Sequence, residues 1–229
     1  MLALALAFGC APFPRAAPEP RAVAPPETPP EAVLALPTAL PAVPATQRPV
    51  REPVPNPTFV MLEQALAAVA TELTDEERIA VAAEITRAER EVGLPALLIV
   101  ALIQQESRFD SNAVGPRGSL GLMQLRTFVA ADVAQRRGLD YDGRETLFDP
   151  VRNVELGCVY LAELRDEFGT VALALAAYNK GPSRVHRDLR HGREPGRRFV
   201  SQVLERYGAY DQRFGLPSTP AALAPEAAQ

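Results

Sequence analysis

Most of the chain carries the apolar spacing of amphipathic helices. From Thr58 to Phe214, apolar residues recur three and four positions apart, and no segment alternates between apolar and polar residues. No internal repeat is present. We therefore expect an all-α domain over residues 58–214, which is long enough to bury a core of its own.

Capping residues mark the boundaries of the first helices. Thr74 to Glu77 read as a capping box, which predicts a helix up to about Val92, and Gly93 suits its C-terminal end. Residues 95–107 are apolar enough for a buried strand. The proline at their start, their length and their Ala, Leu and Gln content favour a helix instead.

Asp149 and Pro150 are typical of another helix start, with Asp as the N-cap and Pro in the first turn. Glycines and prolines divide the remaining apolar segments. Helices are predicted at residues 59–73, 128–137, 150–168, 171–178 and 197–213, with a loop around Gly115, Gly118 and Gly121.

Proline dominates the segment that precedes this domain. Fifteen of the 23 prolines lie between Pro12 and Pro57, among few large apolar residues. Such a segment buries too little to offset its ordering entropy, so we expect residues 11–57 to be an extended, polyproline-like linker. Residues 215–229 return to Ala and Pro and are expected to be a disordered tail.

The first ten residues are apolar and end at Gly9 and Cys10. They are too short to span a bilayer. Residues 1–10 resemble the end of a bacterial lipoprotein signal, truncated so that the basic region is missing, and with Ala7 where Leu is usual. The resemblance implies export and lipidation at Cys10; another exported form is the alternative.

The remaining cysteine and the histidines suggest no further chemistry. If Cys10 carries lipid, Cys158 has no disulfide partner, and its apolar neighbours predict a small buried hydrophobe. His186 and His191 are expected at the surface. No metal-ligand spacing occurs, so we expect neither a metal nor a cofactor. A net charge of −4 argues mildly against a nucleic-acid partner.

Glu106 is the first candidate for catalytic chemistry. The apolar run that begins at Leu97 ends at this carboxylate. Burial raises a carboxyl pKa, and the negative end of a helix disfavours the anion further. A Glu with a raised pKa is a useful proton donor near neutral pH. The alternative is a solvated residue at a helix end.

Four motifs follow one another along the chain, at Gln105 to Asp110, Gly118 to Gln124, Leu147 to Leu161 and Ala177 to Pro182. Their order and spacing resemble the catalytic domain of bacterial lytic transglycosylases, soluble and membrane-bound, over roughly Leu94 to Tyr207. The resemblance implies a lysozyme-like helical fold that acts on peptidoglycan glycan strands as a monomer. The expected location is periplasmic, at the cell membrane or outer membrane.

The resemblance also implies roles for six residues. Glu106 matches the catalytic acid/base, and Tyr178 the tyrosine beside it. Ser107 would place that Glu or the substrate, or merely cap the helix. Met123 and Gln124 would line the sugar cleft, with core packing as the alternative for Met123. Asn179 would belong to the same site, or signal the end of a helix. Asp149 stays structural.

The motifs supply one catalytic carboxylate, whereas ordinary glycoside hydrolysis uses two. The resemblance implies that Glu106 protonates the bond between N-acetylmuramic acid and N-acetylglucosamine. It then takes the proton of the muramic 6-hydroxyl, which closes a 1,6-anhydro ring. A goose-type lysozyme-like hydrolase and a non-catalytic wall-binding scaffold are the alternatives.

Some residues depart from the family pattern. Residues 126–130 replace the usual Pro-x-Thr-Ala, Lys180 stands where Ala is commonest, and Phe199 replaces a Tyr. Lys180 is a candidate partner for a lactyl or peptide carboxylate. Six arginines lie close together in one segment, which is either a solvated basic loop or a region that attracts the anionic wall polymer. These are Arg184, Arg187, Arg190, Arg193, Arg197 and Arg198.

Overall fold

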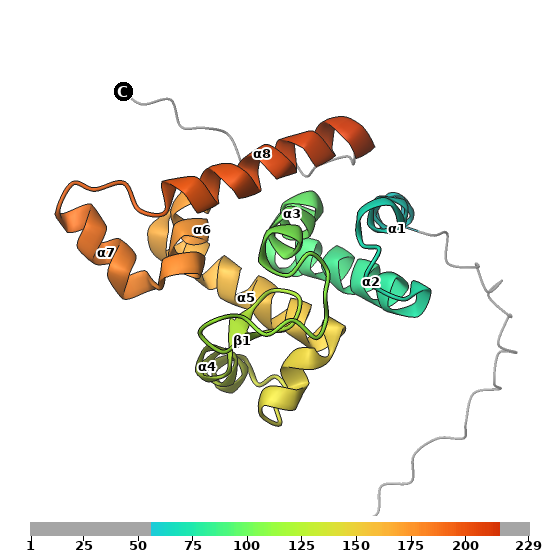
Figure 1. Cartoon of the computed structure of the whole chain (residues 1–229), viewed down its shortest axis with the longest axis horizontal. Coiled ribbons are helices and arrows are strands. Elements are labelled where there is room, and N and C mark those ends of the chain that lie inside the picture. The colour runs from blue at the N-terminus through green and yellow to red at the C-terminus, as the bar shows by residue number, and fades with distance from the viewer. Residues whose placement is uncertain (1–55, 216–229) are drawn as a thin grey trace, which may run out of the picture. The chain divides into compact units, whose positions relative to one another are not determined.

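The computed structural model describes residues 56–215. The predicted signal, its Cys10, nearly all of the proline-rich linker and nearly all of the tail lie outside these residues. Within them the chain is almost entirely helical, as expected (Figure 1). The helices are α1 (Pro57–Val69), α2 (Asp75–Val92), α3 (Ala96–Glu106), α4 (Thr127–Arg137), α5 (Pro150–Phe168), α6 (Val171–Lys180), α7 (Pro182–Arg190) and α8 (Arg197–Phe214).

The helix that carries Glu106 lies in the middle of this assembly (Figure 1). Residues 96–103 of α3 are all buried, which is the pattern of a helix covered on every side. The capping box of α2 is confirmed: Glu77 N–H donates to Thr74 Oγ1 at 3.2 Å, and Thr74 N–H donates to Glu77 Oε2 at 2.8 Å. Glu89 of α2 accepts from Ala96 N–H at 3.0 Å, which caps α3 from a neighbouring helix.

Helix α5 packs against α2 on one side and α6 on the other, while α8 covers α3. Asp149 caps α5 as predicted, accepting from the backbone N–H groups of Val151 and Arg152 at 2.9 and 3.0 Å. Ion pairs join α2 to α5, because Arg87 reaches both Glu84 at 2.6 Å and Glu155 at 2.9 Å. This pairing gives two nearly buried carboxylates a partner.

The predictions for the lone thiol and the histidines are confirmed. Cys158 is 1 % exposed inside the core. His186 lies at the surface, with Nε2 2.7 Å from Glu167 Oε1, and His191 is exposed just after α7. No helix within residues 56–215 is long and apolar enough to cross a bilayer.

Three local elements differ from the sequence-based expectation. The glycine-rich loop contains a two-stranded antiparallel sheet, β1 (Ser119–Leu120) and β2 (Leu125–Arg126), whose strands are too short to show a period of two. A 3₁₀ turn, η1 (Arg144–Phe148), precedes α5. Half of the arginine-rich segment, expected as a loop, forms α7, in which only Val185 and Asp188 are buried.

Candidate active site

Glu106 is the last residue of α3, where the buried helix meets the surface. Its side chain is partly exposed, and burial raises its pKa from 4.5 to about 7. Within residues 56–215, no neighbouring carboxylate contributes to this rise. The group is therefore an isolated acid, and it holds its proton near neutral pH while still facing solvent.

Ser107 closes the end of α3 directly after this acid. Its hydroxyl donates to Ile103 O at 3.3 Å and accepts from Phe109 N–H at 3.1 Å. These bonds are those of a cap, so the hydroxyl holds the turn that follows the carboxyl. Phe109 is fully buried and anchors the same turn in the core.

Backbone strain concentrates in this part of the chain. Arg108, Phe109 and Gln124 have φ angles of 57°, 69° and 50°, and they are the non-glycine residues with positive φ in the described part of the chain. Side chains disfavour this conformation, which persists only where the surrounding structure enforces it. Arg108 and Phe109 lie in the predicted motif before the loop, and Gln124 ends the motif that contains Gly118 and Gly121 of the loop.

Gln124 uses its side-chain amide to hold that loop together. Nε2 donates to Gly121 O at 2.9 Å and to Ala113 O at 3.2 Å, and Oε1 accepts from Ser119 Oγ at 2.7 Å. Every strong hydrogen-bonding direction of the amide is in use except one lone pair. The side chain therefore shapes the loop beside the acid.

The resemblance implied a substrate contact for Met123, but its side chain is 0 % exposed and packs in the core. A Cβ added to Gly157 of α5 would collide with its sulfur, so the helix approaches closely here. The core-packing interpretation of Met123 is the one the structure supports. Met123 contributes to the site through its backbone N–H and carbonyl groups, not through its side chain.

Asn153 fixes that backbone, and sequence reasoning did not identify it as a site residue. This fully buried amide accepts from Met123 N–H at 2.7 Å and donates to Leu120 O at 2.9 Å and Leu147 O at 2.8 Å. A polar residue on the apolar face of α5 was the available signal, because buried amides are paired.

Tyr178 of α6 reaches the same backbone from the other side. Its hydroxyl donates to Met123 O at 2.8 Å, and its ring lies 5.4 Å from that of Tyr160. Burial, and then the nearby negative charge of Glu106, raise the pKa of Tyr178 well above its usual range. The phenol is therefore neutral, close to the acid, and commits its one proton to the loop.

Asn179 differs from the other predicted residues because it is exposed. It lies inside the last turn of α6, which ends at Gly181 with a φ of 86°. Glycine rather than Asn179 therefore ends the helix. The structure brings Glu106 and Tyr178 together, with Ser107, Met123 and Gln124 in the turns that support them.

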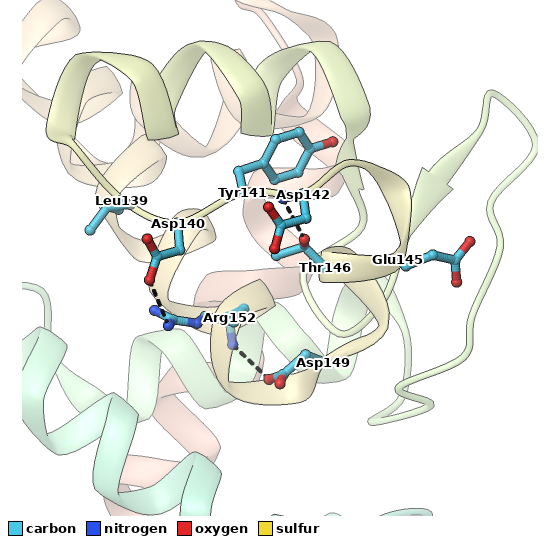
Figure 2. Close-up of a pocket in the computed structure, with 8 residues that line it drawn as sticks. All are labelled: Leu139, Asp140, Tyr141, Asp142, Glu145, Thr146, Asp149 and Arg152. Carbon is cyan, nitrogen blue, oxygen red and sulfur yellow. Dashed lines mark hydrogen bonds and ion pairs between the residues drawn. The ribbon is translucent and has the colours of Figure 1, made fainter.

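A separate pocket of about 600 Å³ lies where residues 139–149 meet the start of α5 (Figure 2). None of the predicted site residues lines it. Acidic side chains surround it, and Figure 2 shows Asp140 paired with Arg152, at 3.3 Å. Among residues 56–215, no group of three or more His, Cys, Asp or Glu side chains is arranged to hold a metal ion.

Known proteins resemble this chain in sequence. The chain is 34 % identical over 125 residues to a soluble lytic murein transglycosylase of Salmonella typhimurium, covering 52 % of this chain and 19 % of that protein. It is 35 % identical over 113 residues to a membrane-bound lytic murein transglycosylase C of Serratia proteamaculans, covering 45 % and 32 %. It thus spans a third or less of either relative's length.

A solved structure shares the fold. An inactive glutamate-to-glutamine mutant of the lytic transglycosylase Slt from Pseudomonas aeruginosa superimposes with a TM-score of 0.55 at 26 % identity, over 69 % of this chain and 31 % of that one. Residues 84–198, from the middle of α2 to the start of α8, match the transglycosylase SLT domain. This range is half of the chain and contains every predicted catalytic and substrate-binding residue. The chain therefore belongs to the transglycosylase SLT domain family.

Proposed function

We propose that this protein is a peptidoglycan lytic transglycosylase with Glu106 as its single acid/base. The observation that carries the proposal is a partly exposed carboxyl at the end of a buried helix, with a pKa raised to about 7 and no carboxylate partner among residues 56–215. A general acid works best when its pKa lies near the working pH.

The proposed reaction uses one carboxyl twice. Protonated Glu106 donates to the glycosidic oxygen that leaves C1 of N-acetylmuramic acid. The resulting carboxylate then accepts the proton of the 6-hydroxyl of the same sugar, whose oxygen bonds to C1 and closes the 1,6-anhydro ring. Water takes no part, and an internal nucleophile supplies high effective molarity. This chemistry explains how one acid can replace the usual pair.

Tyr178 acts in this proposal as a neutral neighbour that positions the acid. Its hydrogen bond to Met123 O fixes the loop beside Glu106, and its ring helps to exclude water. Ser107 and Gln124 hold the turns on either side of the loop. Asn179, which is exposed at the end of α6, is the residue that we propose to contact the sugar directly.

The named relatives support the substrate. Two of them are named as murein transglycosylases, and in the Slt of Pseudomonas aeruginosa a glutamate-to-glutamine mutant is inactive. By analogy we propose murein as the substrate here. We further propose a periplasmic location with a lipid anchor at Cys10, since one relative is named as membrane-bound.

Mass spectrometry of digested peptidoglycan tests the proposal. Wild-type protein should release muropeptides lighter by one water than those of a hydrolase, and Glu106→Gln should release none. Glu145→Gln is a matched control, because that carboxylate is 82 % exposed and belongs to no predicted motif. Circular dichroism should show that both variants are folded.

The other outcomes identify the alternatives. Products with an ordinary reducing end would indicate a goose-type hydrolase on the same fold. No products from the wild type, with intact binding to walls, would indicate a scaffold. Lysis by Glu106→Gln would show that the acid is a different residue.

A further inference from the structure

Positive charge gathers in one short part of this acidic chain. Residues 180–198 contain seven Arg or Lys and two Asp or Glu, a net charge of +5, whereas the whole chain carries −4. These residues form the end of α6, all of α7, the following loop and the first two residues of α8. Figure 1 shows α7 at the edge of the domain beside α6, far from α1 and α2.

Asp188 holds three of these cations in place. Its carboxylate is 6 % exposed and lies 2.9 Å from Arg193, 3.6 Å from Arg184 and 3.8 Å from Lys180. The hydrogen bond from Arg193 is the main cause that lowers the pKa of Asp188, so the group stays ionised. Together with buried Val185, it fastens α7 to the domain.

The other arginines have no such structural task. Arg187 and Arg190 are exposed on the side of α7 opposite Val185, and Arg198 is exposed in the first turn of α8. None of these three forms an ion pair within residues 56–215. Arg197 is 80 % exposed, and its one ion pair in the described part of the chain is a long one, at 3.9 Å from Glu194, which is 70 % exposed. Unpaired like charges repel one another, which costs stability unless a partner neutralises them.

We infer that Arg187, Arg190 and Arg198 form a docking surface for the carboxylates of peptidoglycan stem peptides, which we call the basic surface; the inference rests on the proposed function. Charge complementarity identifies the partner, because the peptides of the wall carry free carboxylates along each glycan strand. The guanidinium group binds a carboxylate in a two-pronged arrangement that lysine cannot reproduce. α7 begins at Pro182, the residue that closes the last motif, so the basic surface follows the candidate site directly in the sequence.

A binding assay tests the inference in the full chain. All proteins carry Glu106→Gln, so that walls are not digested, and they are sedimented with insoluble peptidoglycan. The test variant combines Arg187→Gln, Arg190→Gln and Arg198→Gln. The matched control removes three exposed arginines elsewhere, Arg90→Gln, Arg144→Gln and Arg213→Gln.

The test variant should bind intact walls roughly tenfold more weakly at low salt, since each exposed ion pair contributes little by itself. The difference should disappear near ~1 M salt, where the Debye length is about 3 Å. It should also disappear with walls stripped of their peptides by an amidase. The control variant should bind like the parent on every substrate.

Several results would overturn the inference. Equal binding of the test variant and the parent to intact walls would show that the basic surface does not bind peptidoglycan. An equal loss of binding in the control variant would show that the loss reflects net charge and not these three arginines. The same proteins are also sedimented with vesicles of anionic phosphatidylglycerol. If the test variant loses binding to these vesicles but not to walls, the basic surface binds membranes instead. Activity is scored separately with Glu106 restored: the test variant should cleave peptide-free glycan strands as fast as wild type. If wild type releases no anhydro product, the proposed function fails while the binding comparison still stands.

Discussion

Glu106→Gln should make the protein more stable at alkaline pH, although it removes the proposed catalytic acid. The folded state raises the pKa of this carboxyl from 4.5 to about 7. Each pKa unit corresponds to about 1.4 kcal/mol, so burying the ionised form costs about 3.5 kcal/mol at most. Because the side chain is partly exposed, solvent screening reduces this figure, and we expect about 2 kcal/mol.

The direction of this change in stability with pH follows from proton binding. Between pH 4.5 and 7 the folded state binds more protons at Glu106 than the unfolded state does. The free energy of unfolding of the wild type therefore falls as pH rises through this window, and the whole penalty remains above it. A glutamine resembles the protonated form at every pH. The two proteins should match at about pH 4 and diverge above it, with the variant more stable.

Urea unfolding followed by circular dichroism at about pH 4, 6 and 8.5 measures this difference. The control is Glu145→Gln, whose difference from wild type should not change across the range, since its carboxylate is exposed. A wild type that is as stable as Glu106→Gln at pH 8.5 would refute the reasoning. It would mean that the carboxyl is not desolvated in the fold.

Other predictions concern the loop and its supports. Cleavage of peptidoglycan by the wild type should decrease as pH rises through 7, because Glu106 must start protonated, and initial rates that stay level to pH 9 would contradict this. Tyr178→Phe removes the hydrogen bond to Met123 O and should cost about 1 kcal/mol in urea unfolding together with a lower kcat; an unchanged kcat would limit Tyr178 to packing. Asn153→Ala leaves three backbone groups unpaired and should cost about 3 kcal/mol or more, seen as a lower Tm. Gly157→Ala forces a Cβ against the sulfur of Met123 and should cost about 1–3 kcal/mol in the same measurement, whereas an unaltered Tm would show that the sulfur can move aside.

Local signals mark several of the helix ends that the sequence predicted correctly. The Thr74 capping box, Gly93 and the Asp149 cap act within one helical turn, so their effect needs no knowledge of the rest of the fold. The β1–β2 hairpin has no such signal. Its two short strands lie in a loop that is held by the side chain of Gln124 from within and by Asn153 of α5 from outside.

The arginine-rich segment shows the same limit. The charges of this segment favoured a loop over a helix, because α7 buries only Val185, which packs in the core, and Asp188, which pairs with cations of the same segment. Whether Asp188 is buried depends on the cations that surround it. The local sequence supplies these cations, but the burial of the carboxylate follows only from the packing of α7.

At the candidate site, the sequence by itself determined which side chains are available: one glutamate at the end of an apolar run, and Tyr178 after a second one. Tertiary structure decided what each can do. Packing buried the Met123 side chain and engaged the amide of Gln124 within the loop. It also raised the pKa of Glu106, because desolvation comes from every neighbour that displaces water and not from the residues adjacent in sequence.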